Sequence, residues 1–372
     1  MFADLGVLTW VAASIPALMW VGLLLVPWRP WSTREHVEAD AMSPVDLGEI
    51  TVLIPARNEA DLIGATLAAL QVQAHGLNVV VIDDQSSDAT VQIAAAYPNT
   101  RVISGKPLPE GWAGKLWALE QGMAHVHTAM TLLLDADIQL QPGLLGCLLA
   151  HKQREGRQLV SLMADLRRTS FWDRLLLPVF VYYFKLLYPF SLSNSRNRHV
   201  AAAAGGCVLV DTQVLRHVGA FASLRDALID DCTLARQVKN AGYSTWLGLS
   251  REVVSLRPYG TLGSIHDMVA RSAFTQLGYS TPLLMAVTAV FALAYGLPFV
   301  LLGLVHVWPL GLVAWVAMTL SYLPVLRYYR MSPLWALLLP LSAVLYLGMT
   351  WSSALRYWRG IRSRWKGRTY SV

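Results

Sequence analysis

The sequence is poor in charge and in cysteine. Of its 372 residues only 15% are charged and 55% are hydrophobic, whereas about a quarter of the residues of a globular protein are charged. The three cysteines form no CxxC pair, which argues against a disulfide framework or a zinc ribbon. No GxGxxG motif follows a predicted strand, so a dinucleotide-binding fold has no support. The 24 acidic residues argue against a pure membrane bundle, and the composition predicts a soluble domain attached to membrane segments.

Charge is absent from segments at both ends of the chain, which are residues 5–28, 281–326 and 331–355. About 20 apolar residues are enough to span a bilayer. We predict an N-terminal transmembrane anchor over residues 1–30. A cleaved signal peptide is less favoured, because Asp4 stands where such a peptide carries basic residues.

The two later segments predict C-terminal transmembrane segments over residues 281–355. The first is long enough for a helical hairpin that turns near residues 306–309, and the second is long enough to cross once. The basic tail that follows, residues 356–372, holds six basic residues and no acid, so the rest of the chain balances 24 basic against 24 acidic residues.

The tail creates a conflict. The positive-inside rule predicts a cytoplasmic tail, whereas three crossings from a cytoplasmic domain would place it on the opposite side. Either one apolar segment is re-entrant or interfacial, or the rule is broken here.

The region between the membrane segments, residues 31–280, alternates buried strands with helices. The strands are predicted at residues 50–54, 77–82, 130–134 and 159–163. Such alternation is typical of a mostly parallel sheet covered on both faces. Ligands of these sheets bind at the carboxyl ends of the strands.

Carboxylates follow three of these strands, and Glu59 is the one after the first strand. Asp83 and Asp84 end the second, where they either serve a ligand or cap the next helix. Asp135 and Asp137 end the third, and a pair with this spacing can hold Mg²⁺ together with substrate phosphate oxygens. The alternative for this pair is a turn of solvated acids.

Two glycine motifs are also candidates. Residues 111–115 end in Lys115 and precede a helix, whose N-terminus attracts anions. This is not a P-loop, because Pro109 stands where the first glycine should be and Leu116 replaces Ser/Thr. Gly205 and Gly206 either form a flexible turn into a strand or line a pocket.

A last candidate begins the helix that ends at Asn240. Asp230 and Asp231 lie near its N-terminus, where acids favour the helix dipole. Asp231 could equally act as a general base. Spacing alone does not separate these two roles.

Taken in order, these motifs resemble family 2 glycosyltransferases with a GT-A fold. The motifs are residues 54–59 (IPARNE), 83–88 (DDQSSD), 135–137 (DAD), 205–206 (GG) and 230–234 (DDCTL). The likeness covers about residues 48–280. With its terminal segments the whole chain looks like the bacterial hopanoid-associated glycosyltransferases, and the layout is similar to that of carotenoid-acid and ceramide glucosyltransferases.

The resemblance implies an α/β fold, a GT-A nucleotide-sugar-binding (Rossmann-like) domain over residues 31–280 with flanking transmembrane helices. It also implies a multi-pass protein of the bacterial inner membrane with a cytoplasmic catalytic domain. The reaction implied is inverting transfer of one sugar from a nucleotide sugar to a lipid such as a hopanoid. The expected donor is a UDP-sugar.

The resemblance also assigns roles to single residues. Asp231 matches the catalytic base, and Asp135 and Asp137 match the DxD pair that binds Mg²⁺ or Mn²⁺. The donor-binding positions are Pro55, Arg57, Glu59, Asp83, Asp84, Lys115 and Asp135. The acceptor or pocket positions are Gly205, Gly206, Asp230 and Arg271.

One departure from the family pattern bears on the reaction. Processive and ceramide-type relatives carry a (Q/R)xxRW motif, but residues 271–276 (RSAFTQ) hold only Arg271 and Gln276 as approximate counterparts. This argues against polymerising synthases. The nearby His266 is either a third metal ligand or a surface histidine.

The chemical class of the acceptor is inferred from an apolar segment within the predicted catalytic domain. Residues 171–190 are apolar and interrupted by prolines, which predicts an interfacial helix; the alternative is a buried helix of the soluble domain. An interfacial helix favours a lipid acceptor.

Two rival functions remain. One is a polyprenyl-phosphate sugar transferase, for which Arg196, Arg198 and His199 are available, and the other is a non-catalytic membrane scaffold. Nucleic-acid binding is not expected, because the basic residues do not form an aromatic-interleaved face.

Overall fold

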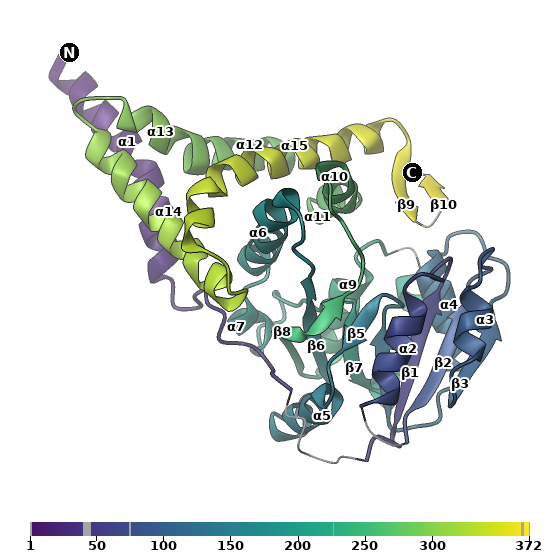
Figure 1. Cartoon of the computed structure of the whole chain (residues 1–372). Helices are drawn as coiled ribbons and strands as arrows, with labels where there is room; N and C mark the ends of the chain where they lie inside the picture. Colours follow the sequence, from purple (N-terminus) through teal and green to yellow (C-terminus); the bar gives the residue numbers. More distant parts are fainter. Residues whose placement is uncertain (1, 40–45, 74–75, 226, 366–367, 372) are drawn as a thin grey trace.

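The computed structural model describes residues 2–39, 46–73, 76–225, 227–365 and 368–371. A sheet with helices on both faces forms one part, and a group of long apolar helices lies against it (Figure 1). This is a mixed α/β fold with apolar helices in the C-terminal region.

Within the described residues, eight strands form the main sheet. Their order is β3 (Thr100–Ser104), β2 (Asn78–Asp83), β1 (Ile50–Ala56), β4 (Met130–Leu134), β7 (Cys207–Asp211), β6 (Leu159–Leu166), β8 (Thr245–Ser255) and β5 (Ile138–Leu140). The strands β3, β2, β1 and β4 are parallel neighbours. The sheet therefore brings the carboxyl ends of β2, β1 and β4 together, as the sequence predicts.

The other half of the sheet differs from the mostly parallel sheet that we expected. Strand β7 pairs antiparallel with both β4 and β6, and β5 pairs antiparallel with β8. Alternation along the chain does not reveal this, because β7 is separated from β6 by the helices α6 (Phe171–Leu187) and α7 (Phe190–Ser193). The strands β3, β5 and β8 were not predicted.

Apolar residues on the two faces of the sheet pack against different helices. One face is covered by α2 (Ile63–Gln71), α3 (Thr90–Ala95) and α5 (Leu144–Arg154). The other face is covered by α4 (Gly114–Met123), α8 (Thr212–His217) and α9 (Asp230–Asn240). Alternating residues of β1 serve both faces, with Val52 in the first cluster and Leu53 in the second. Two-sided burial explains the continuous apolar runs of these strands.

Helix α6 is buried, which corrects the prediction of an interfacial helix over residues 171–190. Throughout this fully described segment, only Phe171 and Leu187 are exposed among the large hydrophobic residues. The reason is tertiary: α6 packs between the sheet domain and the helices α14 (Trp308–Tyr328) and α15 (Leu339–Trp358). Apolar composition alone does not distinguish lipid from protein as the covering material.

The predicted N-terminal anchor is the helix α1 (Phe2–Leu25), which packs against α14. Its sequence carries no charge from Leu5 to Leu25.

In the described part of the C-terminal region, three helical segments are long and apolar enough to cross a membrane: residues 281–302, 308–328 and 333–358. The first comprises α12 (Thr281–Phe291), a π-helical turn and α13 (Leu297–Leu302). A turn over residues 303–307 joins the first two segments, near the position where the sequence predicts one. Of the basic tail, residues 361–365 and 368–371 form a β-hairpin, β9 (Ile361–Trp365) and β10 (Arg368–Ser371), and Lys366 lies outside the described residues.

Asp173 fixes the start of α6. Its buried carboxylate accepts hydrogen bonds from the backbone N–H groups of Thr169, Ser170 and Gly260, at 3.2, 3.0 and 2.9 Å. Ser170 returns a capping contact to the N–H of Asp173. One side chain thereby joins α6 to the loop before α10 (Leu262–Ala270).

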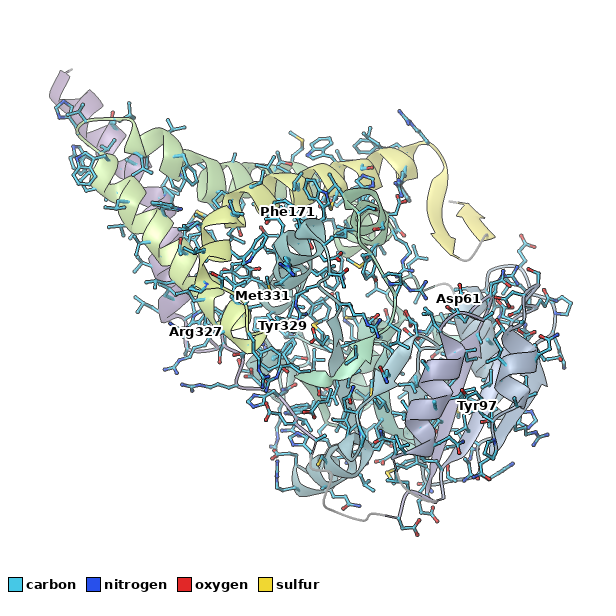
Figure 2. All side chains as sticks on the ribbon, viewed as in Figure 1. Asp61, Tyr97, Phe171, Arg327, Tyr329 and Met331 are labelled. Atoms are coloured by element: carbon cyan, nitrogen blue, oxygen red, sulfur yellow. The ribbon has the colours of Figure 1, made fainter. Side chains whose placement is uncertain are left out.

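Asp173→Ala is expected to destabilise the protein by about 2–3 kcal/mol, because buried N–H groups lose a charged acceptor. Thermal or chemical unfolding in detergent measures this loss. The control is Asp61→Ala, which removes an exposed carboxylate at the far end of the sheet domain (Figure 2) and should change stability by less than about 0.5 kcal/mol. Equal stability of the two variants would contradict the capping role of Asp173.

Candidate active site

Two loops at the carboxyl edge of the sheet are tied together. Asn58 follows β1 and Gln85 follows β2, and both have positive φ, 50° and 58°. The Asn58 N–H donates to Ser86 Oγ at 3.0 Å, and the Ser87 N–H donates to Asn58 Oδ1 at 2.8 Å. Arg57 adds hydrogen bonds to the carbonyl oxygens of Asp84 and Gln85. These contacts give the two predicted motifs one fixed arrangement.

Two carboxylates at the end of β2 and in the loop after it accept hydrogen bonds from backbone N–H groups of these loops. Asp83 is buried and accepts the Ser86 N–H at 3.2 Å. Asp88 accepts the N–H groups of Ala60 and Thr90 at 3.1 and 3.0 Å, which joins the β1 loop to the first residue of α3. Asp84 is also buried, and its backbone N–H donates to the Ala56 carbonyl.

The two acids after β4 each face a cation. Asp135 Oδ1 lies 2.7 Å from Lys115 Nζ, and Asp137 Oδ2 lies 2.8 Å from Arg257 Nε. Arg257 also contacts Glu59 Oε1 through Nη2 at 3.0 Å. Burial and the negative charge of Asp135 raise the pKa of Asp137, while Arg257 opposes this shift. The arrangement compensates the charge of both carboxylates.

Arg257 is a site residue that the sequence analysis missed. It follows β8, an unrecognised strand, and lies 120 residues from Asp137 and 198 from Glu59 along the chain. Its contacts connect the β1 loop to the Asp135–Asp137 pair. An arginine directly after a buried strand was the available signal, but it required β8 to be identified first.

Lys115 lies in the first turn of α4. Its ammonium contacts Asp135 and lies 3.8 Å from Asp230 Oδ2. Burial alone would lower the pKa of Lys115, but the nearby Asp135 and Asp230 outweigh it and raise the pKa above its ordinary value. The side chain is therefore a permanent positive charge at this position.

Asp231 lies close to Lys115, across from Gly205. Its Oδ2 accepts the Gly205 N–H at 2.8 Å, and its Oδ1 accepts the Cys232 N–H at 2.7 Å. Desolvation and the neighbouring Asp230 raise the pKa of Asp231 to about 6, against the opposing effect of the Cys232 hydrogen bond and Lys115. A carboxylate with a pKa near neutrality is suited to proton transfer.

Gly205 lies close to the charged groups of the site. A Cβ there would lie 3.3 Å from Asp231 Oδ2 and 3.4 Å from Lys115 Nζ. A side chain at this position would therefore crowd the carboxylate that accepts the Gly205 N–H. Gly206 approaches Ile138 in the same way, at 3.2 Å.

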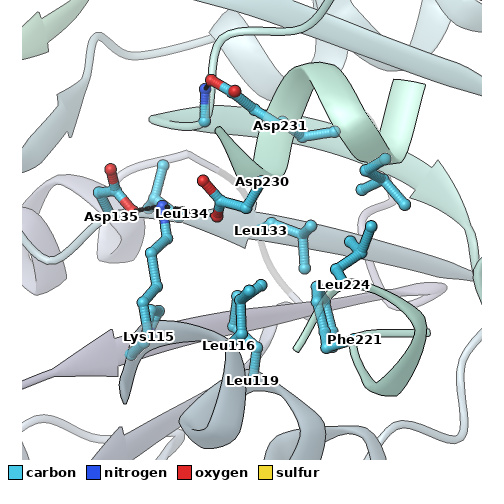
Figure 3. A pocket seen from close by; sticks show the side chains of 14 residues that line it. Lys115, Leu116, Leu119, Leu133, Leu134, Asp135, Phe221, Leu224, Asp230 and Asp231 are labelled. Carbon is cyan, nitrogen blue, oxygen red and sulfur yellow. Dashed lines mark hydrogen bonds and ion pairs between the residues drawn. The ribbon is translucent and has the colours of Figure 1, made fainter. Parts of the chain in front are cut away.

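One pocket collects these groups (Figure 3). Its polar end has Lys115, Asp135, Asp230 and Asp231, and its other end is lined by leucines and Phe221. Of the residues singled out in the sequence, the pocket is lined by Pro55, Lys115, Asp135, Gly205, Asp230 and Asp231. Outside its lining lie Arg57, Glu59, Asp83, Asp84, Asp137, Gly206 and Arg271. Arg271 is exposed at the C-terminal end of α10.

Within the described residues, no group of three or more His, Cys, Asp or Glu side chains could hold a metal ion by itself. His266 lies on α10, where its Nδ1 is 3.3 Å from Arg356 Nη2 and 3.4 Å from Asp267 Oδ1. Because the Arg356 guanidinium lies next to this nitrogen, the structure does not support His266 as a metal ligand.

Comparisons with known proteins show similarity to glycosyltransferases. Residues 51–219 match the family described as Glycosyl transferase family 2. A 4,4'-diaponeurosporenoate glycosyltransferase of Staphylococcus aureus (strain USA300) is 36% identical over 89 residues, which cover 24% of this chain and 24% of the relative. The match thus spans about a quarter of that relative. Asp230, Asp231 and Arg257 lie beyond the family match.

Among solved structures, the mannosyltransferase PcManGT from Pyrobaculum calidifontis, in complex with GDP-Man and Mn²⁺, is similar over most of both chains. The TM-score is 0.55 at 18% identity, and the likeness covers 93% of this chain and 97% of that one. At this level of identity the likeness shows a shared fold alone, which is the GT-A fold that the sequence predicts.

Proposed function

We propose that this chain, a glycosyltransferase with a family 2 domain over residues 51–219, transfers one sugar from a nucleotide sugar to a membrane lipid with inversion. The donor we propose is a UDP-sugar, and the acceptor is a lipid alcohol or acid such as a hopanoid. The observation that carries the proposal is the position of Asp231, which shares a pocket with Lys115 and Asp135.

The apolar helices support a lipid acceptor, because they pack directly on the catalytic domain through α6. The partial relative is named for diaponeurosporenoate, a carotenoid acid, which is consistent with an apolar acceptor. We accordingly propose a multi-pass protein of the bacterial inner membrane with its catalytic domain in the cytoplasm.

We assign the donor's nucleotide to the β1 and β2 loops, with Arg57, Glu59, Asp83 and Asp84 as the binding residues and Pro55 at the pocket. Lys115 would bind a diphosphate oxygen as a fixed positive charge. Gly205, Gly206, Asp230 and Arg271 are proposed for the acceptor side.

Asp135 and Asp137 fit a hard divalent cation, since Mg²⁺ takes one or two carboxylates and completes its shell with water and substrate phosphates. These two residues would hold Mg²⁺ or Mn²⁺, which supplies charge neutralisation for the departing diphosphate. The cations Lys115 and Arg257 now paired with them would then have to shift toward other anions.

Asp231 would take the proton from the acceptor hydroxyl or acid. A bond forms between the acceptor oxygen and the anomeric carbon as the bond from that carbon to the diphosphate breaks, and the nucleoside diphosphate leaves. A single displacement inverts the anomeric carbon. Proximity and electrostatic stabilisation would supply most of the acceleration.

The proposal is tested with a panel of UDP- and GDP-sugars and a bacterial lipid extract, read by mass spectrometry. We expect one nucleotide sugar to give a lipid product heavier by a single hexose. Product only on polyprenyl phosphate would favour the rival transferase, and no product with any donor would favour the scaffold.

The pH dependence follows from the Asp231 pKa of about 6. The base must be ionised, so kcat/KM should rise as pH increases through about 6 and level off above it. Asp230→Asn removes the negative charge that raises this pKa, and should move the acid limb to lower pH. A rate profile between about pH 5 and pH 8 measures both effects, and an acid limb unchanged by Asp230→Asn would contradict the assignment.

A further inference from the structure

The two ends of the third apolar segment both touch the catalytic domain. This segment consists of a 3₁₀ turn (Pro333–Leu338) and α15, and it qualifies as a membrane span by length and composition. The residues just before it lie beside the domain: the Arg168 guanidinium stacks on the Tyr329 ring at 4.6 Å. Arg327, Tyr329 and Met331 are found together at this junction (Figure 2).

The far end of α15 returns to the same domain. Arg356 Nη2 pairs with Asp267 Oδ1 of α10 at 2.6 Å. One turn earlier, Ser353 Oγ accepts the backbone N–H of Phe274 at 3.1 Å. The end of α15 is therefore held by α10 and α11 (Ala273–Gln276).

The middle of α15 rests on α6. Ser342 Oγ and Tyr346 Oη donate to the carbonyl oxygens of Leu175 and Leu176, at 3.2 and 2.9 Å. A helix of this length extends about 30 Å, which equals the apolar thickness of a bilayer of about 30 Å. A helix held at its start, middle and end by one domain cannot have its ends on opposite sides of that layer.

We propose that α15 lies along the membrane surface instead of crossing the bilayer, and that the basic tail is consequently on the side of the catalytic domain. The faces of α15 fit this placement. Its protein-facing side is buried at Leu339, Ser342, Ala343, Tyr346, Met349, Ser353 and Ala354. Its other side exposes Leu341, Val344, Leu355 and Trp358. An apolar face next to a terminal tryptophan and basic residues is typical of interfacial helices.

Helix α14 makes a useful contrast. Its first turn packs with α1 and α13, through Leu310, Ala13 and Leu301. Only toward its other end does it meet the catalytic domain, where Ser321 Oγ lies 2.7 Å from Tyr182 Oη. Helix α14 thus extends away from the domain, whereas α15 stays on it (Figure 1).

This placement removes the conflict over the tail. Helix α12 lies beside α15, where Trp351 Nε1 donates to Thr288 Oγ1 at 3.0 Å. From there α13 continues away from the catalytic domain to the start of α14, α14 returns, and α15 remains in the surface. The hairpin β9–β10 accordingly turns back toward the catalytic domain (Figure 1). Arg29, Arg327, Arg330 and the basic tail then share one side, as the positive-inside rule requires.

The side of the tail is tested in membrane vesicles with the full chain, in a background without Cys147, Cys207 and Cys232. An impermeant maleimide is applied to inverted and right-side-out vesicles of three variants, Ser371→Cys in the tail, His306→Cys in the α13–α14 turn and Gln71→Cys in the catalytic domain. We expect Ser371→Cys to be labelled in the same vesicles as Gln71→Cys, and His306→Cys in the opposite ones. Labelling of Ser371→Cys together with His306→Cys would overturn the proposal.

The depth of α15 is tested separately with spin labels at Val344→Cys and, as the matched control, Val316→Cys in α14. Both positions are exposed, at 67% and 46%. Power-saturation measurements should place the Val344 label at the headgroup boundary, about 5–10 Å deep, and the Val316 label near the bilayer centre. Equal depths near the centre would also overturn the proposal.

Discussion

Asp231→Asn is expected to slow sugar transfer severely while leaving donor binding unchanged. A general base contributes typically about 10²–10⁴-fold to a rate, so kcat should fall by a factor in that range. The amide has nearly the same shape as the carboxylate and keeps one acceptor oxygen for the Gly205 or Cys232 N–H that Asp231 now accepts. What it loses is the ability to take a proton at neutral pH.

The measurement is kcat with saturating donor and lipid acceptor, alongside calorimetric binding of the nucleoside diphosphate. Asp46→Asn is a suitable control because, among the described residues, Asp46 accepts a local turn hydrogen bond from the Gly48 N–H before β1, and its kcat should be unchanged. A kcat for Asp231→Asn within a factor of about two of the wild type would exclude the base role.

Asp137→Asn is expected to remove the response to divalent metal and to lower kcat/KM by about 10²-fold or more, the usual cost of losing one group that stabilises developing charge. Asp137 is mostly buried and is held by Arg257. The variant should still fold, because Arg257 keeps its second partner, Glu59.

Two readouts separate this role from a structural one. After EDTA treatment, wild-type activity should disappear and return with added Mn²⁺, and the variant should not recover. Binding of Mn²⁺ in the presence of the nucleoside diphosphate, followed by electron paramagnetic resonance, should weaken in the variant and not in Asp46→Asn. Full wild-type activity in EDTA would refute the metal assignment.

The strands that carry the carboxylates were predictable from local sequence. Continuous β-branched and apolar runs are typical of strands buried on both faces, and β1, β2 and β4 were recognised in this way. Parallel neighbours bring their carboxyl ends to one edge. The shared position of Asp83 and Asp135 at that edge therefore followed from the chain order alone.

Long-range pairing was not predictable by the same reasoning. Arg257 reaches Asp137 and Glu59 only because β8 pairs with β6 and β5 in a mixed half of the sheet. Similarly, the approach of Gly205 to Asp231 depends on how β7 and α9 pack, and no spacing within the sequence encodes that distance.

The sequence by itself determined the composition of the parts: an α/β domain rich in strand-end acids, apolar segments on either side of it and a basic tail. The tertiary structure decided which apolar segment is covered by protein and which is open to other surroundings. Helix α6 is buried beneath α14 and α15, while α15 keeps an exposed apolar face. The physical reason is that apolar side chains gain similar free energy in a protein core and in lipid, so the sequence pattern is the same for both and only packing separates them.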